Sequence, residues 1–269
     1  MFFLPLQFFV VAFLLAPISF AVQRNAVQAR DSNYNGDGNP VCFELSLTWA
    51  PVQPNGHARD SILMNGQFSG PTLELNQGDN VEFLVHNYLP FPVTIHFHGI
   101  AQIGTPWSDG VPGVSQRPIK PGQSFLYRWT AVDYGTYFYH AHERGHILDG
   151  LYGPIIVKPS GQEPTAFGMI SNNTADIAAM LKAEADANPM VVSEWVSFTS
   201  DEIVEFEKET GIDFICVDSI LINGKGQENC LPQSEINSLT NPALAPILNG
   251  TQLTPKGYVA VSDMELRNS

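Results

Sequence analysis

The chain has 269 residues, of which 27 are acidic and 13 basic, so its formal net charge is −14 at pH 7. This balance argues against nucleic acid or an anionic membrane surface as a partner, since both are bound by basic patches. The length allows one large domain or two of ordinary size. Twenty prolines and 22 glycines indicate many turns and favour an all-β chain over a helical one.

The first 21 residues are apolar and contain no charged side chain. An apolar core over residues 8–15 is followed at residues 19–21 by a sequence that resembles a signal-peptidase cleavage site, so residues 1–21 are expected to be a secretory signal peptide. We therefore expect a secreted protein, extracellular or in the cell wall, without membrane association after cleavage. Two sequons, at Asn172 and Asn249, could be glycosylated in that compartment.

The next segment, residues 22–40, is mostly polar and without periodicity, which predicts a flexible leader. From residue 41 onward, short stretches alternate between apolar and polar residues, the pattern of strands with one buried face. Strands are predicted at residues 42–49, 73–75, 81–87, 93–97, 124–130, 135–140 and 154–157. Short strands punctuated by Gly and Pro predict a β-sandwich over residues 41–160.

The following stretch, residues 161–189, is interpreted as a linker with a short helix. The helix is expected over 176–187 and ends before Pro189. Three apolar residues mark one face of it: Ile177, Met180 and Leu181.

Strand character returns at residue 190. Thr199 and Glu202 have the spacing of a capping box, which predicts the start of a second short helix. Residues 220–226 then have the pattern of a strand and a turn.

Two His-x-His pairs, at His96 and His98 and at His140 and His142, stand at the ends of predicted strands. Both histidines of a pair face one side of a strand, with their Cα atoms about 6.5–7 Å apart. Two imidazoles at that separation can ligate one ion or two adjacent ions. Imidazole suits copper or zinc better than magnesium or calcium, and the spacing alone does not choose between the first two. The structural alternative is that the four histidines are bonded to backbone carbonyls near the strand ends.

The residues around the pairs decide between these alternatives. The first pair leads into GTPWSDG (104–110), the second pair ends GTYFYHAH (135–142), and DGLYGP (149–154) follows. This order and spacing resemble the first cupredoxin domain of the multicopper oxidases, and most closely the ascomycete pigment-type laccases among the fungal laccases. The resemblance runs from about Phe43 to about Gly257.

The resemblance implies a cupredoxin-like Greek-key β-sandwich, with one complete domain over 41–160 and an incomplete second domain over 190–269. It implies copper as the cofactor. His96 matches a ligand of the type 2 copper, and three histidines match ligands of the paired type 3 coppers: His98, His140 and His142. In the family these coppers form a trinuclear cluster that reduces dioxygen to water while phenolic substrates are oxidised one electron at a time. The laccase branch suggests a role in pigment or secondary-metabolite biosynthesis.

Two carboxylates are further candidates for catalysis. Asp109 resembles the family's acidic residue close to the cluster, where it could supply protons or orient water; the alternative is an ordinary Asp-Gly turn. Glu194 matches an acidic position in the laccase phenol pocket and could accept the proton lost by an oxidised phenol. The alternative is that Glu194 is an ordinary solvent-facing residue of a strand. The Trp-Tyr-His that usually continues this motif is replaced by Trp-Val-Ser, which puts the substrate preference in doubt.

The remaining ligand runs of the family, including the His-Cys-His run that holds the type 1 copper, do not occur in this sequence. The expectation is therefore a truncated laccase-type oxidase. The alternatives are a remnant without catalytic activity, which binds copper weakly or only a partner, and a ferroxidase of the same family. The cysteines are Cys42, Cys216 and Cys230. The last two could form a disulfide and leave Cys42 unpaired.

The 269-residue chain, made as written and loaded with copper, should show neither an intense blue absorption band nor oxygen uptake with a phenol. The blue band of type 1 sites comes from a cysteine thiolate bound to copper, and none of the three cysteines is flanked by histidines. Absorption spectra and an oxygen electrode, with free copper removed, test this. Appreciable copper-dependent oxygen uptake would reveal an electron route that the sequence does not contain.

Overall fold

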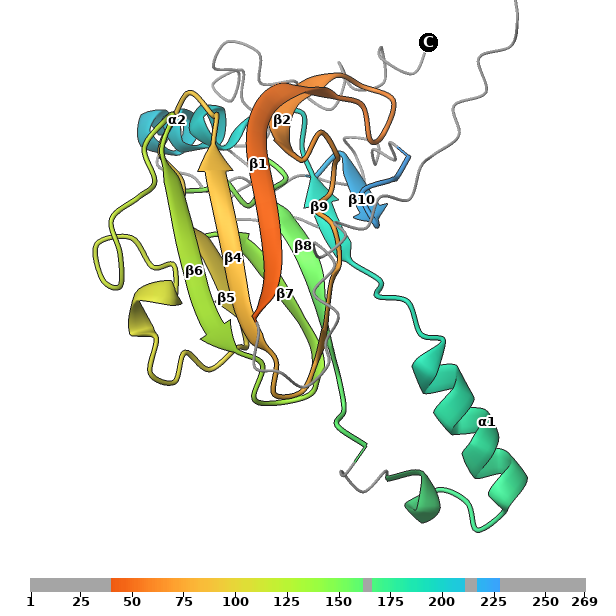
Figure 1. Ribbon diagram of the computed structural model, residues 1–269. Coiled ribbons are helices and arrows are strands. Elements are labelled where there is room, and N and C mark those ends of the chain that lie inside the picture. Colours follow the sequence, from red (N-terminus) through yellow and green to blue (C-terminus); the bar gives the residue numbers. More distant parts are fainter. Residues whose placement is uncertain (1–39, 162–165, 211–216, 228–269) are drawn as a thin grey trace, which may run out of the picture.

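The computed structural model describes residues 40–161, 166–210 and 217–227 (Figure 1). The expected signal peptide, almost all of the leader, the sequon at Asn249, Cys216 and Cys230 lie outside the described residues. Within the described part of the chain, no helix is long and apolar enough to cross a membrane.

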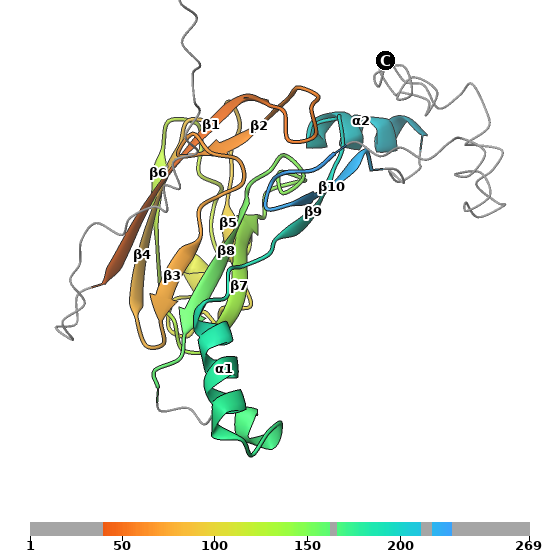
Figure 2. The ribbon, with the colours of Figure 1, turned by 90° about the vertical axis from the view of Figure 1, so that its right-hand side faces the viewer.

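Two four-stranded sheets pack face to face and form the body of the molecule (Figures 1 and 2). The first sheet has the order β2–β1–β4–β6, with β1 and β4 parallel and the other neighbours antiparallel. Its strands are β1 (Val41–Val52), β2 (Arg59–Met64), β4 (Asn80–Asn87) and β6 (Ser124–Thr130).

The second sheet has the order β3–β8–β7–β5, so β5 forms one edge and β8 lies on the far side of β7. Its strands are β3 (Leu73–Asn76), β5 (Ile95–His98), β7 (Gly135–Ala141) and β8 (Tyr152–Lys158). A short 3₁₀ helix, η1 (Pro106–Ser108), follows β5 in the chain. The all-β sandwich predicted from the alternating pattern is confirmed.

The core between the sheets is rich in aromatic residues. Phe83 of the first sheet packs edge to face against Phe97 of the second, with ring centroids 5.3 Å apart. The buried Tyr127 reaches across the core, where its hydroxyl oxygen accepts a hydrogen bond of 2.9 Å from the backbone N–H of Ile95. Since Ile95 begins β5, this bond fixes the strand that carries the first histidine pair.

The helical segment after the sandwich comprises η2 (Ala166–Met169) and α1 (Thr174–Ala185). Asn173 caps α1 by accepting a hydrogen bond of 2.9 Å from the N–H of Ala175. The helix lies where the sequence predicts one, but no residue of it is buried, and Leu181 is 40% exposed. Both views show α1 standing away from the sandwich (Figures 1 and 2).

The last described part of the chain returns to the sandwich. It contains β9 (Val192–Trp195), α2 (Ser200–Thr210) and β10 (Ser219–Ile222), and β9 and β10 form an antiparallel pair. The capping box is confirmed, because the N–H of Thr199 donates to the Glu202 carboxylate at 2.7 Å and the N–H of Glu202 to the Thr199 hydroxyl at 3.4 Å.

A buried polar junction, formed by Arg59, Asp149, Trp195 and Ser200, joins this last part to the sandwich. The Arg59 guanidinium lies 4.0 Å over the Trp195 ring and 3.9 Å from the Asp149 carboxylate. The same carboxylate accepts hydrogen bonds from the N–H and the hydroxyl of Ser200, at 2.9 and 2.5 Å, and so caps α2. Burial lowers the pKa of Arg59 and raises that of Asp149, and the opposite charge of each partner counteracts this effect.

Replacing Arg59 by Met should destabilise the chain by about 3–5 kcal/mol, because it leaves the buried Asp149 carboxylate without a compensating charge. Urea unfolding followed by fluorescence measures the loss. Arg128→Met is the matched control, since the Arg128 side chain is 56% exposed and pairs with Glu82 at 2.8 Å on the surface. Exposed pairs contribute less than about 1 kcal/mol, so equal losses in both variants would contradict the role given to the junction.

Candidate metal centre

The strand register brings the two histidine pairs together. In the antiparallel β5–β7 pair, His96 lies opposite His140 and His98 opposite Phe138. Ile95 and Phe97 are fully buried in the core, so the alternating histidines of β5 face the outer side of the second sheet. His142 follows just beyond β7, where its backbone N–H donates to the carbonyl of Thr94 at 3.2 Å.

The four rings of His96, His98, His140 and His142, called here the histidine cluster, are close neighbours. The ring centroid of His96 lies 5.4 Å from those of His98 and His140, and 5.3 Å from that of His142. The His140 centroid lies 5.5 Å from that of His98 and 5.8 Å from that of His142. The structure therefore gathers all four histidines predicted from the sequence.

Ring nitrogen atoms of three of these residues lie close together. One ring nitrogen each of His96, His98 and His140 lies within 4.8 Å of the others. An ion of the first transition series binds imidazole at about 2.0–2.1 Å, so two ligands of one ion are at most about 4.2 Å apart. The donor set therefore fits a transition-metal ion after a small side-chain rotation, or two adjacent ions that share the cluster.

Asp109 lies beside His96. Its backbone carbonyl accepts a hydrogen bond of 2.6 Å from Nδ1 of His96, and its carboxylate oxygen lies 3.4 Å from the same nitrogen. The next residue, Gly110, has a φ of +80°, and a Cβ there would lie 1.9 Å from the carbonyl oxygen of Ile95. Glycine thus permits the Asp-Gly turn to approach β5. The bond to Nδ1 leaves Nε2 of His96 to face a metal.

His140 is half-buried, and its Nδ1 is 2.8 Å from the carbonyl oxygen of Ala141, so its Nε2 remains for a ligand. That Nε2 lies 3.3 Å from Nδ1 of His98. Burial is the main cause that lowers the pKa of His140, and the neighbouring histidines lower it further. A lowered pKa keeps the ring neutral near pH 7, which is the form that binds metals.

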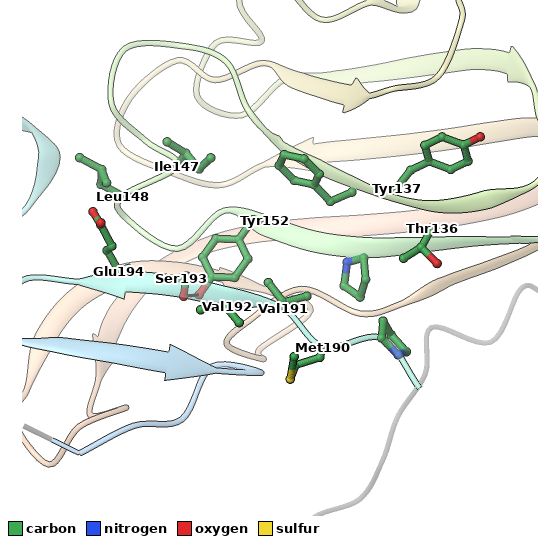
Figure 3. A pocket seen from close by; sticks show the side chains of 13 residues that line it. Thr136, Tyr137, Ile147, Leu148, Tyr152, Met190, Val191, Val192, Ser193 and Glu194 are labelled. Carbon is green, nitrogen blue, oxygen red and sulfur yellow. Dashed lines mark hydrogen bonds between the residues drawn. The ribbon is translucent and has the colours of Figure 1, made fainter. Parts of the chain in front are cut away.

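Glu194 does not belong to the cluster. It is an exposed residue of β9 and lines a pocket of about 450 Å³ between β9 and the outer face of the second sheet (Figure 3). The other three histidines of the chain also lie elsewhere: His86 contacts Ser124 and Glu44 on the first sheet, His146 is buried against Phe91, and His57 is half-buried.

Sequence reasoning missed Phe138. Its ring stacks on His98 and on His140, with centroids 4.8 and 5.0 Å apart and interplanar angles of 19° and 22°. Its position two residues before His140 on a predicted strand already placed it on the same face, so the period of two could have identified it.

Comparisons with known proteins agree with this arrangement. Residues 46–162 match the multicopper oxidase family. The multicopper oxidase elcG of Phaeosphaeria nodorum is 46% identical over 86% of this chain and 38% of its own length. Laccase abr2 of Aspergillus fumigatus is 47% identical over 81% of this chain and 37% of its own length. The chain therefore spans little more than a third of the length of these relatives.

Solved structures of multicopper oxidases are also similar to this chain. The structure of Fet3p, described as a multicopper oxidase that functions in iron import, gives a TM-score of 0.57 at 28% identity, over 70% of this chain and 33% of that one. The laccase from Botrytis aclada gives a TM-score of 0.56 at 27% identity, over 79% of this chain and 35% of that one.

The chain belongs to the multicopper oxidases, and within them to the fungal laccase type. The fold is the cupredoxin-like Greek-key sandwich, and the family uses copper.

Replacing His98 by Ala should lower the amount of copper bound by the purified chain, because it removes one of the three ring nitrogen atoms that lie within 4.8 Å of one another. His57→Ala is the control, since His57 lies outside the cluster, and it should leave copper uptake unchanged. Metal content after gel filtration, with free copper removed, is the measurement. Equal uptake by the two variants would show that copper binds elsewhere.

Proposed function

We propose that this chain carries copper ligands of a secreted fungal laccase-type oxidase, which couples one-electron oxidation of phenols to reduction of dioxygen to water. The observation that carries the proposal is the histidine cluster, four imidazoles with ring centroids 5.3–5.8 Å from their neighbours, on one face of a multicopper oxidase domain. A role in pigment or secondary-metabolite formation is part of the same proposal.

His96 would hold the type 2 copper, and His98, His140 and His142 would hold the type 3 pair. Bound copper would supply the one-electron redox chemistry that dioxygen reduction requires. The protein orients the rings: Asp109 fixes His96 through its backbone carbonyl, and the carbonyl of Ala141 fixes His140. Ligand rings held in this way lose little freedom when a metal binds.

Asp109 is proposed to hold and deliver protons. Reducing one dioxygen to two waters consumes four electrons and four protons, and a carboxylate close to the ligands can relay the protons from solvent. The Asp109 side chain is 37% exposed and its oxygen lies 3.4 Å from Nδ1 of His96, so it touches both water and the cluster.

Glu194 is proposed to accept the proton that a phenol loses when it gives up an electron. Its carboxylate lies at the end of the pocket, beside Leu148 (Figure 3). The rest of the lining is mostly apolar and aromatic, which suits a phenolic ring.

A ferroxidase of the same family is the second candidate, because Fet3p, which functions in iron import, has a similar fold. The laccase proposal has the stronger support, since a protein named as a laccase is 47% identical to this chain. A remnant without catalytic activity is the third. A reading frame that contains this sequence and also encodes a His-Cys-His run favours either oxidase. A reading frame that lacks this run favours the remnant.

Asp109→Asn, introduced into a laccase-length protein that contains this sequence, should lower oxygen uptake with a phenol roughly 10²-fold, since general acid catalysis contributes about 10²–10⁴-fold. Asparagine keeps the backbone carbonyl that fixes His96, so copper content should not change. Asp60→Asn is the control, because Asp60 is exposed on β2, away from the cluster. An unchanged rate in Asp109→Asn would rule out the proton-delivery role.

A further inference from the structure

A second cluster of reactive side chains lies on the solvent-facing side of the first sheet, where β1, β4 and β6 run side by side (Figure 1). It consists of Glu44 of β1, His86 of β4 and Ser124 of β6, called here the Ser-His-Glu triad. The hydroxyl oxygen of Ser124 lies 2.7 Å from Nδ1 of His86, and Nε2 of the same ring lies 3.0 Å from the Glu44 carboxylate. The histidine cluster lies on the other sheet, so the triad is a separate site.

The strand register explains why the three side chains meet. His86 lies opposite Ser124 in the antiparallel β4–β6 pair. The N–H of Asn87 donates to the carbonyl of Gln123, so the adjacent pair of His86 and Ser124 does not exchange backbone hydrogen bonds. The side chains of such a pair are the closest, since the Cα atoms are about 4.5 Å apart. Glu44 lies two residues before the position opposite His86 on β1, and therefore on the same face.

The hydrogen bonds assign a role to each ring nitrogen of His86. An ionised carboxylate can only accept a hydrogen bond, so Nε2 carries the proton that Glu44 accepts. Nδ1 is then the unprotonated nitrogen, and it accepts the hydrogen bond that the Ser124 hydroxyl donates. A nucleophile, a base that can take its proton and a third group that orients the base are the parts that activate serine in hydrolytic enzymes.

The triad is accessible to a substrate. Ser124 is exposed, and the side chains of Glu44 and His86 are 50% and 23% exposed. Tyr88 follows β4, is 62% exposed and stacks on His86 with ring centroids 6.2 Å apart and an interplanar angle of 17°. Its ring offers an apolar surface on which an aryl group can pack beside the Ser124 hydroxyl.

The backbone around Ser124 limits the chemistry. Because β6 is an edge of the first sheet, the N–H of Ser124 points to the open side, as does that of Arg128, which donates to the Ser108 hydroxyl oxygen. The N–H of Ser124 is one donor for the oxyanion of an attacked ester, whereas serine hydrolases place at least two. Lack of one such donor costs about 10²–10³-fold in rate, so the site suits esters whose leaving group departs readily.

We propose that the Ser-His-Glu triad makes Ser124 a nucleophile that is acylated by activated carboxylic esters, and by aryl esters in particular. The Ser124 oxygen bonds to the ester carbonyl carbon while its proton passes to Nδ1 of His86, and Glu44 stabilises the charged ring. The bond from this carbon to the aryl oxygen then breaks, and the leaving group takes the proton and departs as a phenol. Water hydrolyses the acyl-serine by the same proton transfers, which releases the carboxylic acid and restores the hydroxyl.

This activity goes beyond the laccase-type function, because it transfers no electron and needs no copper. The structural alternative is that the three side chains are only a cross-strand ladder. The same face carries two further cross-strand contacts, Arg128 to Glu82 at 2.8 Å and Thr130 to Asn80 at 2.9 Å. A ladder predicts no reaction at Ser124, whereas the proposal predicts a reaction whose rate depends on His86 and Glu44.

The test uses the metal-free 269-residue chain with p-nitrophenyl acetate as the probe, and follows acetylation of Ser124 over time by mass spectrometry of acid-quenched peptides. We expect an acetyl group on Ser124 in the wild type. His86→Gln should slow its formation about 10²-fold, since general base catalysis contributes about 10²–10⁴-fold. Glu44→Gln should slow it about tenfold, because a neutral amide stabilises the charged ring less than a carboxylate does.

Ser46→Ala is the matched control. Ser46 lies opposite His86 on β1, and in the described part of the chain no hydrogen bond joins its hydroxyl to His86. The control should leave the acetylation rate of Ser124 unchanged, and Ser46 itself should not be acetylated. Glu44→Gln changes an exposed side chain and keeps its shape, so it decides the question even if His86→Gln does not fold.

The absence of an acetyl group on Ser124 in the wild type would overturn the proposal. Equal acetylation rates of Ser124 in the wild type and Glu44→Gln would also overturn it, as would acetylation of Ser46 as fast as that of Ser124. Since the probe reacts without copper, each of these results would leave the copper proposal unaffected.

Discussion

The buried pair of Arg59 and Asp149 is the interaction on which the pocket beside β9 depends. Arg59 also donates to the carbonyls of Phe198 and Leu148, so one side chain of β2 holds both the loop after the second histidine pair and the segment between β9 and α2. Burying two charges is costly unless they are paired and hydrogen-bonded, and here each charge has several partners. These bonds tie the β9 segment to the loop, and both segments line the pocket.

The junction also explains why the loop runs close to α2. A Cβ on Gly145 would lie 2.9 Å from Cβ of Ser200, the residue that Asp149 holds. His142 precedes this loop and Leu148 lies within it, so the loop ties a predicted copper ligand to the pocket wall. A change at the junction would therefore disturb both sites through the backbone, although Arg59 is not one of the residues that gather at the histidine cluster.

The sequence predicted the features that depend on local pattern and missed those that depend on register or on buried polar groups. Alternation identified the strands of both sheets except β2, whose buried positions include Arg59 and Ser61, so it shows no apolar period. The His-x-His pairs were found because their spacing is local. Their joining into one cluster rested on resemblance, and so did the expectation that Glu194 lines a pocket. The other lining residues could not be foreseen, since Glu194 meets Tyr152 and Leu148 only after β9 docks on the sheet.

The strand order places the two routes of the proposed reaction, proton delivery through Asp109 and entry of the aromatic substrate, on opposite sides of the histidine cluster. Asp109 contacts His96 on β5, which is the edge of the second sheet, whereas the pocket lies over β7 and β8 on the other side of the cluster. Protons relayed by Asp109 would therefore reach the ligands from one flank, and an aromatic molecule would approach from the opposite flank. An organic donor held on the Glu194 side would not block the water that supplies Asp109, so both could be present at once.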